Sequence, residues 1–75
     1  MLFKVFYQPT KSRSPKRETT QSLFLEYDLS PLDGIIEARK ELTEKTDYNV
    51  EFIDPLSPDA EEYERAEDGF KITTL

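Results

Sequence analysis

The residues of this chain that could carry chemistry are its charged side chains, because the sequence contains no cysteine and no histidine. Thiol nucleophiles, disulfides and thiolate zinc sites are therefore excluded. The side chain that most often titrates near neutral pH is also missing. The charges are unevenly spread: residues 1–20 carry a net +4 and residues 21–75 a net −10, which together give the overall −6. This asymmetry points to binding more than to catalysis.

Six acidic residues gather near the C-terminal end and could in principle hold Mg²⁺ or Ca²⁺. A calcium loop needs acids at alternate positions, a central glycine and a closing glutamate, and this segment lacks that spacing. We therefore expect a solvated helix face or part of an acidic interface, with no metal site and no cofactor. The six residues are Asp59, Glu61, Glu62, Glu64, Glu67 and Asp68.

A basic loop over residues 9–21 is the stronger candidate for a contact site. Arg13, Lys16 and Arg17, together with Glu18, could dock on an acidic protein surface or on phosphates, since arginine donates forked hydrogen bonds. The bland interpretation is a solvated loop made basic for solubility. A net acidic chain is repelled by nucleic acid at long range, so any nucleic-acid contact would be local, through this loop.

Two apolar runs flank the basic loop and predict a β-hairpin. Residues 2–7 and 23–27 alternate with period two, as half-buried strands do. The inward positions of both runs, Phe3 among them, are apolar or aromatic and share one face. This favours packing in a core over the stacking of nucleic-acid bases. Phe6 and Phe24 fall on the opposite face. Either the C-terminal segment covers them, or they form a partner-binding patch.

Serine–proline pairs predict the starts of two helices. Ser30-Pro31 opens a helix to about Lys45 with Ile35, Ala38 and Leu42 in its apolar stripe, and Gly34 is expected to delay the regular helix by one turn. Ser57-Pro58 opens a short helix to about Glu67, followed by a turn at Asp68-Gly69. The acids near each start complement the helix macrodipole.

Two further strands complete the predicted elements. Residues 48–53 place Tyr48, Val50 and Phe52 on one face, and Asp54-Pro55 closes the strand. Residues 70–75 alternate as a last short strand. The order is strand, strand, helix, strand, short helix, strand. This predicts an α+β fold: a small antiparallel or mixed sheet of three to four short strands with the main helix on one face, as one domain over residues 1–75.

Size and hydropathy restrict function further. A chain of this length builds only a modest core, so it leaves little room for a deep cavity and we expect no small-molecule substrate. No segment resembles a signal peptide or approaches a membrane-spanning length, which favours a soluble cytoplasmic protein without membrane contact.

Several short stretches, in order, resemble one known family. They are FKVFYQ at 3–8, SPKRETT at 14–20, SLFLE at 22–26, EAR at 37–39, YNVEFI at 48–53, YE at 63–64 and FKI at 70–72. Together they cover nearly the whole chain. They are similar to the epsilon subunit of bacterial DNA-directed RNA polymerase, a small accessory subunit of low-G+C Gram-positive bacteria.

The resemblance implies a non-catalytic, non-essential component of transcription that binds the polymerase core of alpha, beta and beta-prime subunits by protein–protein contact. It also implies a cytoplasmic, nucleoid-associated location and a fold similar to a small phage inhibitor of RNA polymerase. The nucleotidyltransferase chemistry would belong to the large subunits, so the chain would not be an enzyme by itself.

Two patches are expected to make the contact. The first is Arg13, Lys16, Arg17 and Glu18. The second is Tyr48, Asn49 and Glu51, where polar groups beside a packed aromatic could present a polar edge. Two other functions stay open on the residues. One is a free-standing acidic inhibitor or DNA mimic that uses residues 51–68 in place of phosphates. The other is a metal-dependent nuclease, which would need a carboxylate cage.

Overall fold

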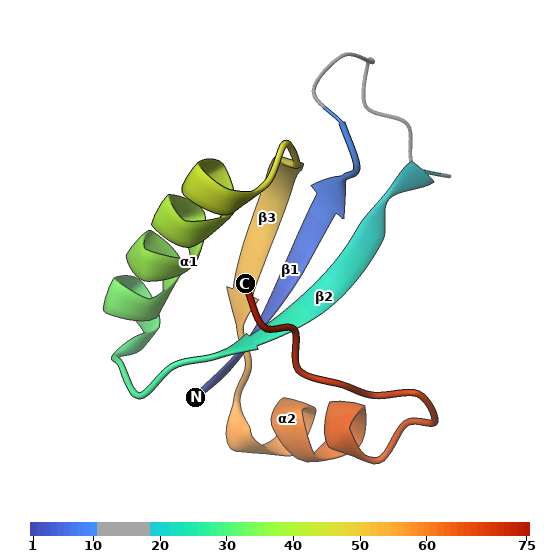
Figure 1. The fold of residues 1–75 in the computed structure, drawn as a ribbon. Coiled ribbons are helices and arrows are strands. Elements are labelled where there is room, and N and C mark those ends of the chain that lie inside the picture. The colour runs from blue at the N-terminus through green and yellow to red at the C-terminus, as the bar shows by residue number, and fades with distance from the viewer. Residues whose placement is uncertain (11–18) are drawn as a thin grey trace.

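The structure, a computed structural model, describes residues 1–10 and 19–75 and has an α+β architecture (Figure 1). Its elements are β1 (Leu2–Gln8), β2 (Gln21–Glu26), α1 (Pro31–Lys45), β3 (Asn49–Pro55) and α2 (Pro58–Arg65). The strands form one antiparallel sheet in the order β2-β1-β3. The predicted fold class and the order of the first five elements are therefore confirmed. Arg13, Lys16, Arg17 and Glu18 lie outside the described residues.

The core lies between the sheet and α1, which packs on one face of it (Figure 1). The period-two alternation of β1 sends Phe3, Val5 and Tyr7 to this face, as the sequence predicts. From α1, Ala38 and Leu42 reach the same core. The remaining buried members are Leu23, Leu25 and Ile53. Six residues from the three strands and two from α1 thus make a single, thin core.

The helix α1 begins at Pro31, without the one-turn delay expected from Gly34. The Ser30 side chain accepts a hydrogen bond from the Asp33 amide at 3.2 Å, which caps the first turn. Gly34 is a buried helical residue because the ring of Phe3 packs directly against it. The delay predicted from propensity was wrong because this packing contact outweighs the low helix propensity of glycine.

A β-bulge in β3 changes which of its residues face the core. Tyr7 pairs with Val50, whereas the preceding Phe6 pairs with Phe52, so Glu51 is an extra residue. Beyond the bulge the faces exchange: Ile53 is 2% exposed and Phe52 is 55% exposed. The prediction that Phe52 shares a face with Val50 was wrong for this reason. The strand extends past residue 53 and ends at Pro55, so it includes the Asp54-Pro55 pair that was expected to close it.

The predicted last strand, residues 70–75, does not form. The chain turns at Gly69, whose φ is +80°, and then crosses the outer edge of β2. Phe70 packs on Phe24 on one face of the sheet, while Leu75 packs against the core on the α1 face. A segment anchored on both faces runs across the edge strand and not along it. One backbone bond joins them, from the Thr73 amide to the Phe24 carbonyl at 2.8 Å.

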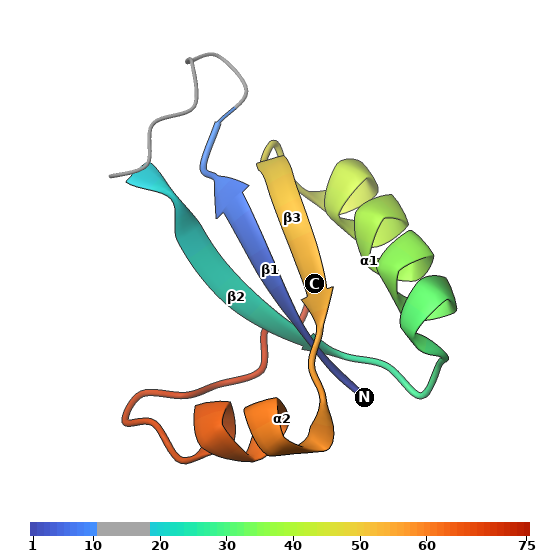
Figure 2. The same cartoon turned by 180° about the vertical axis from the view of Figure 1, so that it is seen from behind.

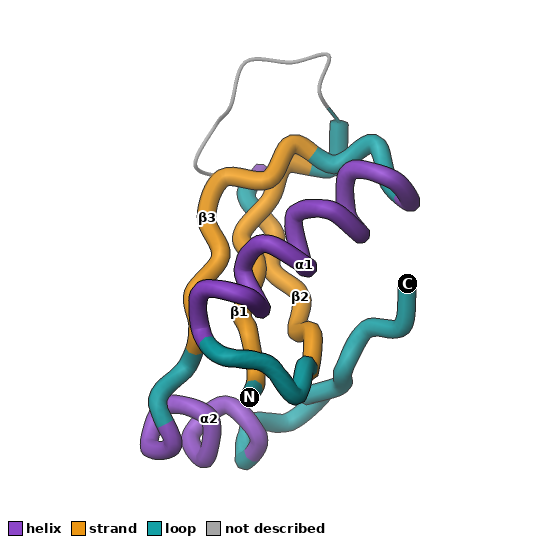
Figure 3. The backbone as a smooth tube through the Cα atoms, turned by 90° about the vertical axis from the view of Figure 1, so that its left-hand side faces the viewer, coloured by secondary structure: helices purple, strands orange, loops and turns teal. Residues whose placement is uncertain are grey.

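Figures 2 and 3 show the result of this crossing: α2 lies at the end of the sheet near the N-terminus, and the C-terminal segment passes from there toward the side of α1. The short helix α2 starts as predicted, with the Ser57 side chain accepting from the Ala60 amide at 3.2 Å. Among the described residues, neither helix combines the length and apolarity needed to cross a membrane.

Candidate protein-contact surface

A polar cluster ties together the strands on either side of residues 11–18. We call Gln8, Thr19, Thr20 and Glu51 the loop-base cluster. The Gln8 Nε2 donates to Thr20 Oγ1 at 3.0 Å and to Glu51 Oε2 at 3.3 Å. Thr20 Oγ1 donates to Glu51 Oε1 at 3.0 Å, and the Thr19 hydroxyl donates to Gln8 Oε1. Gln8 is only 5% exposed, and its buried amide forms hydrogen bonds to the other three members of the cluster.

The second predicted patch is thereby divided. Tyr48 stacks on Tyr7 with ring centroids 4.2 Å apart and is a packing residue at the edge of the core. Burial, and secondarily Tyr48, raises the pKa of Tyr7. Asn49 lies opposite Gln8 in the β1–β3 register, and Glu51 belongs to the loop-base cluster. The structure thus places part of the second patch at the base of the loop that carries the first.

The sheet face opposite α1 carries an aromatic pair that sequence periodicity missed. Phe6 and Phe52 stack with ring centroids 6.3 Å apart and an interplanar angle of 20°. Phe6 faces Ser22 on β2 and Phe52 on β3. Periodicity placed Phe52 on the face of Tyr48 and Val50, and only the bulge at Glu51 reveals that it lies on the opposite face.

The neighbouring part of the same face is covered. Phe24 lies 4.9 Å from Phe70, so the C-terminal segment shields it. Lys4 Nζ lies 5.4 Å from the Phe6 ring centroid and pairs with Glu64 of α2 at 3.1 Å. The sequence left open whether the C-terminal segment covers Phe6 and Phe24 or whether they form an exposed patch. The segment covers Phe24, whereas Phe6 lies beside the exposed ring of Phe52.

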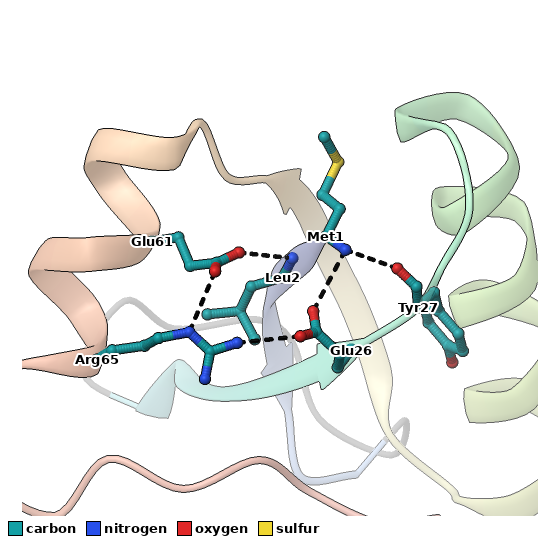
Figure 4. A network of polar contacts seen from close by, with 6 residues as sticks. All are labelled: Met1, Leu2, Glu26, Tyr27, Glu61 and Arg65. Carbon is teal, nitrogen blue, oxygen red and sulfur yellow. Dashed lines mark hydrogen bonds and ion pairs between the residues drawn. The ribbon is translucent and has the colours of Figure 1, made fainter.

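A second polar network holds α2 against the start of β1 (Figure 4). Arg65 Nε donates to Glu61 at 3.1 Å and its Nη2 to Glu26 at 3.0 Å. Glu26 also pairs with the Met1 amino group at 3.4 Å, and Glu61 accepts from the Leu2 amide at 3.1 Å. The hydrogen bond from Arg65, ahead of that from Leu2, holds the pKa of Glu61 below its ordinary value. This network covers the fully buried Leu2 side chain.

The acidic cluster of the sequence is therefore partly structural. Glu61 and Glu64 point into ion pairs with Arg65 and Lys4, while Asp59 and other members are exposed, as on a solvated helix face. Within residues 1–10 and 19–75, no group of three or more acidic side chains gathers closely enough to hold a metal ion. The arrangement can stabilise α2 against β1 and present negative charge on the exposed side.

Comparison with known proteins gives one consistent result. A sequence model described as the RNA polymerase epsilon subunit matches residues 2–74. The DNA-directed RNA polymerase subunit epsilon of Streptococcus gordonii is 53% identical over 74 residues, which cover 97% of each chain. The protein of the same name from Streptococcus equi subsp. zooepidemicus is 54% identical over the same shares. That of Lactococcus lactis subsp. lactis is 49% identical over 76 aligned residues, with 100% of both chains covered.

Proposed function

This chain belongs to the RNA polymerase epsilon subunit family, and we propose that it is a non-catalytic accessory subunit that binds the core of a bacterial RNA polymerase. The observation that carries the proposal is the match over residues 2–74. The polymerase core of alpha, beta and beta-prime subunits is the partner, and the cytoplasm is the compartment that follows from it.

The chemistry of the described residues supports a binding role. Two of the acids on α2 are neutralised by ion pairs: Glu61 pairs with Arg65, and Glu64 pairs with Lys4. Carboxylates that hold catalytic Mg²⁺ need to be left open toward the metal and substrate. This supports a division of roles in which nucleotidyl transfer belongs to the large subunits and this chain contributes contacts.

The contact involves the basic loop and the residues at its base. Arg13, Lys16 and Arg17, with Glu18, provide the cationic contact. Glu51 and Asn49 contribute next to it, because Glu51 accepts a hydrogen bond from Gln8 and Asn49 lies opposite Gln8 in the register. Charged groups of this kind mainly set the rate and specificity of association, with a strong dependence on salt. Tyr48 fixes the position of this part of β3 by stacking on Tyr7.

An acidic inhibitor or DNA mimic is the less favoured function. It relies on negative charge over residues 51–68, yet Glu61 and Glu64 are already engaged in ion pairs within the chain. Pairing reduces the negative field that such a mimic would offer to a basic channel. The family match gives no support to this alternative.

Affinity capture tests the proposal. The tagged chain is used to capture polymerase from the lysate of its own bacterium at moderate and high salt. We expect near-stoichiometric recovery of the large subunits at moderate salt. The triple variant Arg13→Glu, Lys16→Glu and Arg17→Glu is expected to recover much less, and to lose most of the salt dependence.

A matched triple variant controls for the change in net charge. Arg39→Glu, Lys40→Glu and Lys71→Glu reverse three exposed bases elsewhere on the chain and should recover polymerase as the wild type does. Unchanged recovery by the loop variant would refute the loop contact. Failure of the wild type to recover any polymerase would refute the proposed function itself.

A further inference from the structure

One part of the sheet face opposite α1 is left open in the described structure. Phe52 is 55% exposed beside Phe6, whereas Phe24 and Lys4, one row further along the strands, are covered by the C-terminal segment and α2. We call Phe6 and Phe52 the aromatic row. Because Phe52 stacks on Phe6, the two rings form a contiguous apolar patch, which is the kind of surface that can receive a partner.

Two carboxylates border the aromatic row along β3. Asp54 lies opposite Lys4 in the register, so its side chain is on the same face as Phe52. Glu51, on the other side, reaches across this face to Thr20. Within residues 1–10 and 19–75 neither carboxylate forms an ion pair with a lysine or arginine. Lys4, which lies opposite Asp54 in the register, already donates to both oxygens of Glu64.

Carboxylates that lack an ion pair within the described part of the chain, beside an exposed aromatic ring, select the chemistry of the occupant. A wholly apolar segment would bury the charges of Asp54 and Glu51, of which Glu51 accepts hydrogen bonds only from the neutral Gln8 and Thr20, and this is costly. A second copy of the chain would bring like charges together, and the phosphates of a nucleic acid would be repelled by them. A guanidinium satisfies both features, because it stacks flat on an aromatic ring while its edge donates to carboxylates.

We propose that Phe52 and Phe6, with Glu51 and Asp54, form a receptor for an arginine side chain of the polymerase core. The guanidinium stacks on the Phe52 ring and donates hydrogen bonds to the two carboxylates. The ion pairs add specificity, since lysine offers a point charge without a planar face. This inference rests on the proposed function, because the core is the source of the arginine.

Direct binding to purified core polymerase, depleted of this chain, tests the receptor. Fluorescence anisotropy of the labelled chain gives the dissociation constant. Phe52→Leu keeps an apolar side chain but removes the ring, and we expect it to weaken binding by about tenfold. Phe52→Tyr keeps the ring and should bind as the wild type does. Tyr63→Leu removes another exposed ring, on α2, and should leave binding unchanged.

Neutral isosteres test the carboxylates. The pair Glu51→Gln and Asp54→Asn removes both charges at nearly unchanged shape, with one acceptor oxygen kept at position 51. It is expected to weaken binding by about tenfold and to lower its salt dependence. The matched pair Glu44→Gln and Asp47→Asn makes the same charge change at exposed positions and should have no effect. Thermal unfolding of each variant shows whether it remains folded.

The outcomes separate the inference from the function on which it rests. If the wild type does not bind the core, the proposed function fails. If the wild type binds and Phe52→Leu or the neutral pair binds equally well, only the arginine receptor is refuted. A photo-crosslinker placed at position 52 of the otherwise wild-type chain is a second, independent test. A crosslinked polymerase peptide with arginine supports the receptor, whereas one without arginine, or a crosslinked dimer of this chain, refutes it.

Discussion

The ring of Phe3 lies against the backbone of Gly34, so close that a Cβ at position 34 would stand 2.0 Å from Cζ of Phe3. This contact brings α1 onto the sheet at a point where no other residue would fit. Phe3 is fully buried and belongs to the core cluster, so its ring can move only by displacing core neighbours. The helix and β1 therefore determine each other's position through this pair.

Gly34→Ala is expected to destabilise the protein. The overlap with Phe3 costs about 1–3 kcal/mol or more, which exceeds the gain of about 1 kcal/mol in helix propensity. Urea unfolding measures the difference. Lys40→Ala, on the exposed side of the same helix, should change the free energy of unfolding by less than about 0.5 kcal/mol. A Gly34→Ala variant as stable as the wild type would contradict the packing described.

Simple alternation along β3 would place Phe52 on the face of Val50 and Ile53 on the opposite face. Because of the bulge at Glu51, Ile53 is buried and Phe52 is exposed. Ile53→Ala removes a residue that is 2% exposed and should lower the free energy of unfolding by about 2–5 kcal/mol. Phe52→Ala, at a position 55% exposed, should cost roughly 1 kcal/mol or less, chiefly from the stack with Phe6. Equal or reversed costs in urea unfolding would show that β3 has no bulge.

The Glu61–Arg65 pair predicts loss of stability in acid. Because the folded pKa of Glu61 lies below its ordinary value of 4.5, the pair stabilises the folded state above that pH. The stabilisation is lost as the pH falls through the lower, folded pKa. Arg65→Gln should therefore be less stable than the wild type at neutral pH, and the difference should shrink below pH 4.5.

Chemical denaturation across this pH range provides the test. Lys71→Gln serves as the control, since Lys71 is exposed and forms no ion pair within the described residues. Its difference from the wild type should not follow the pH in this way. A difference between Arg65→Gln and the wild type that grows in acid would contradict the assignment.

Tyr27 gives a prediction at the alkaline end. Its hydroxyl is buried and has no hydrogen-bond partner among the described residues, and burial, followed by the charge of Glu41, raises its pKa. Tyr27→Phe should not lower stability, because it removes an unsatisfied polar atom. It should also remove the last tyrosine to ionise in a spectrophotometric titration. Tyr7→Phe loses a hydrogen bond to Gln21 and should be less stable, which provides the contrast.

Local chemistry in the sequence was sufficient to predict much of the fold. Ser30 and Ser57 cap their helices as their position before proline suggests, and β1 alternates without interruption. The bulge at Glu51 could not be read from β3 alone, because it is a property of the register with β1. The close approach at Gly34 likewise depends on Phe3, which is distant in sequence.

The candidate surface was predicted less completely than the fold. Charge alone singled out Arg13, Lys16, Arg17 and Glu18, whose contact role stays a prediction. Glu51 was chosen for its polarity, and the structure adds a role at the base of the loop. Phe52 was placed on the same face as Val50, since a period-two pattern gives no sign of an extra residue in a strand.

The most direct test of the central claim is the composition of the native polymerase. RNA polymerase purified through a tag on its beta-prime subunit, from the bacterium that encodes this chain, would be analysed by quantitative mass spectrometry. The account predicts this chain in near-stoichiometric amount with the core subunits, and its loss as salt is raised during washing. Its absence from polymerase purified at moderate salt, while the chain is abundant in the lysate, would contradict the claim that it is a subunit.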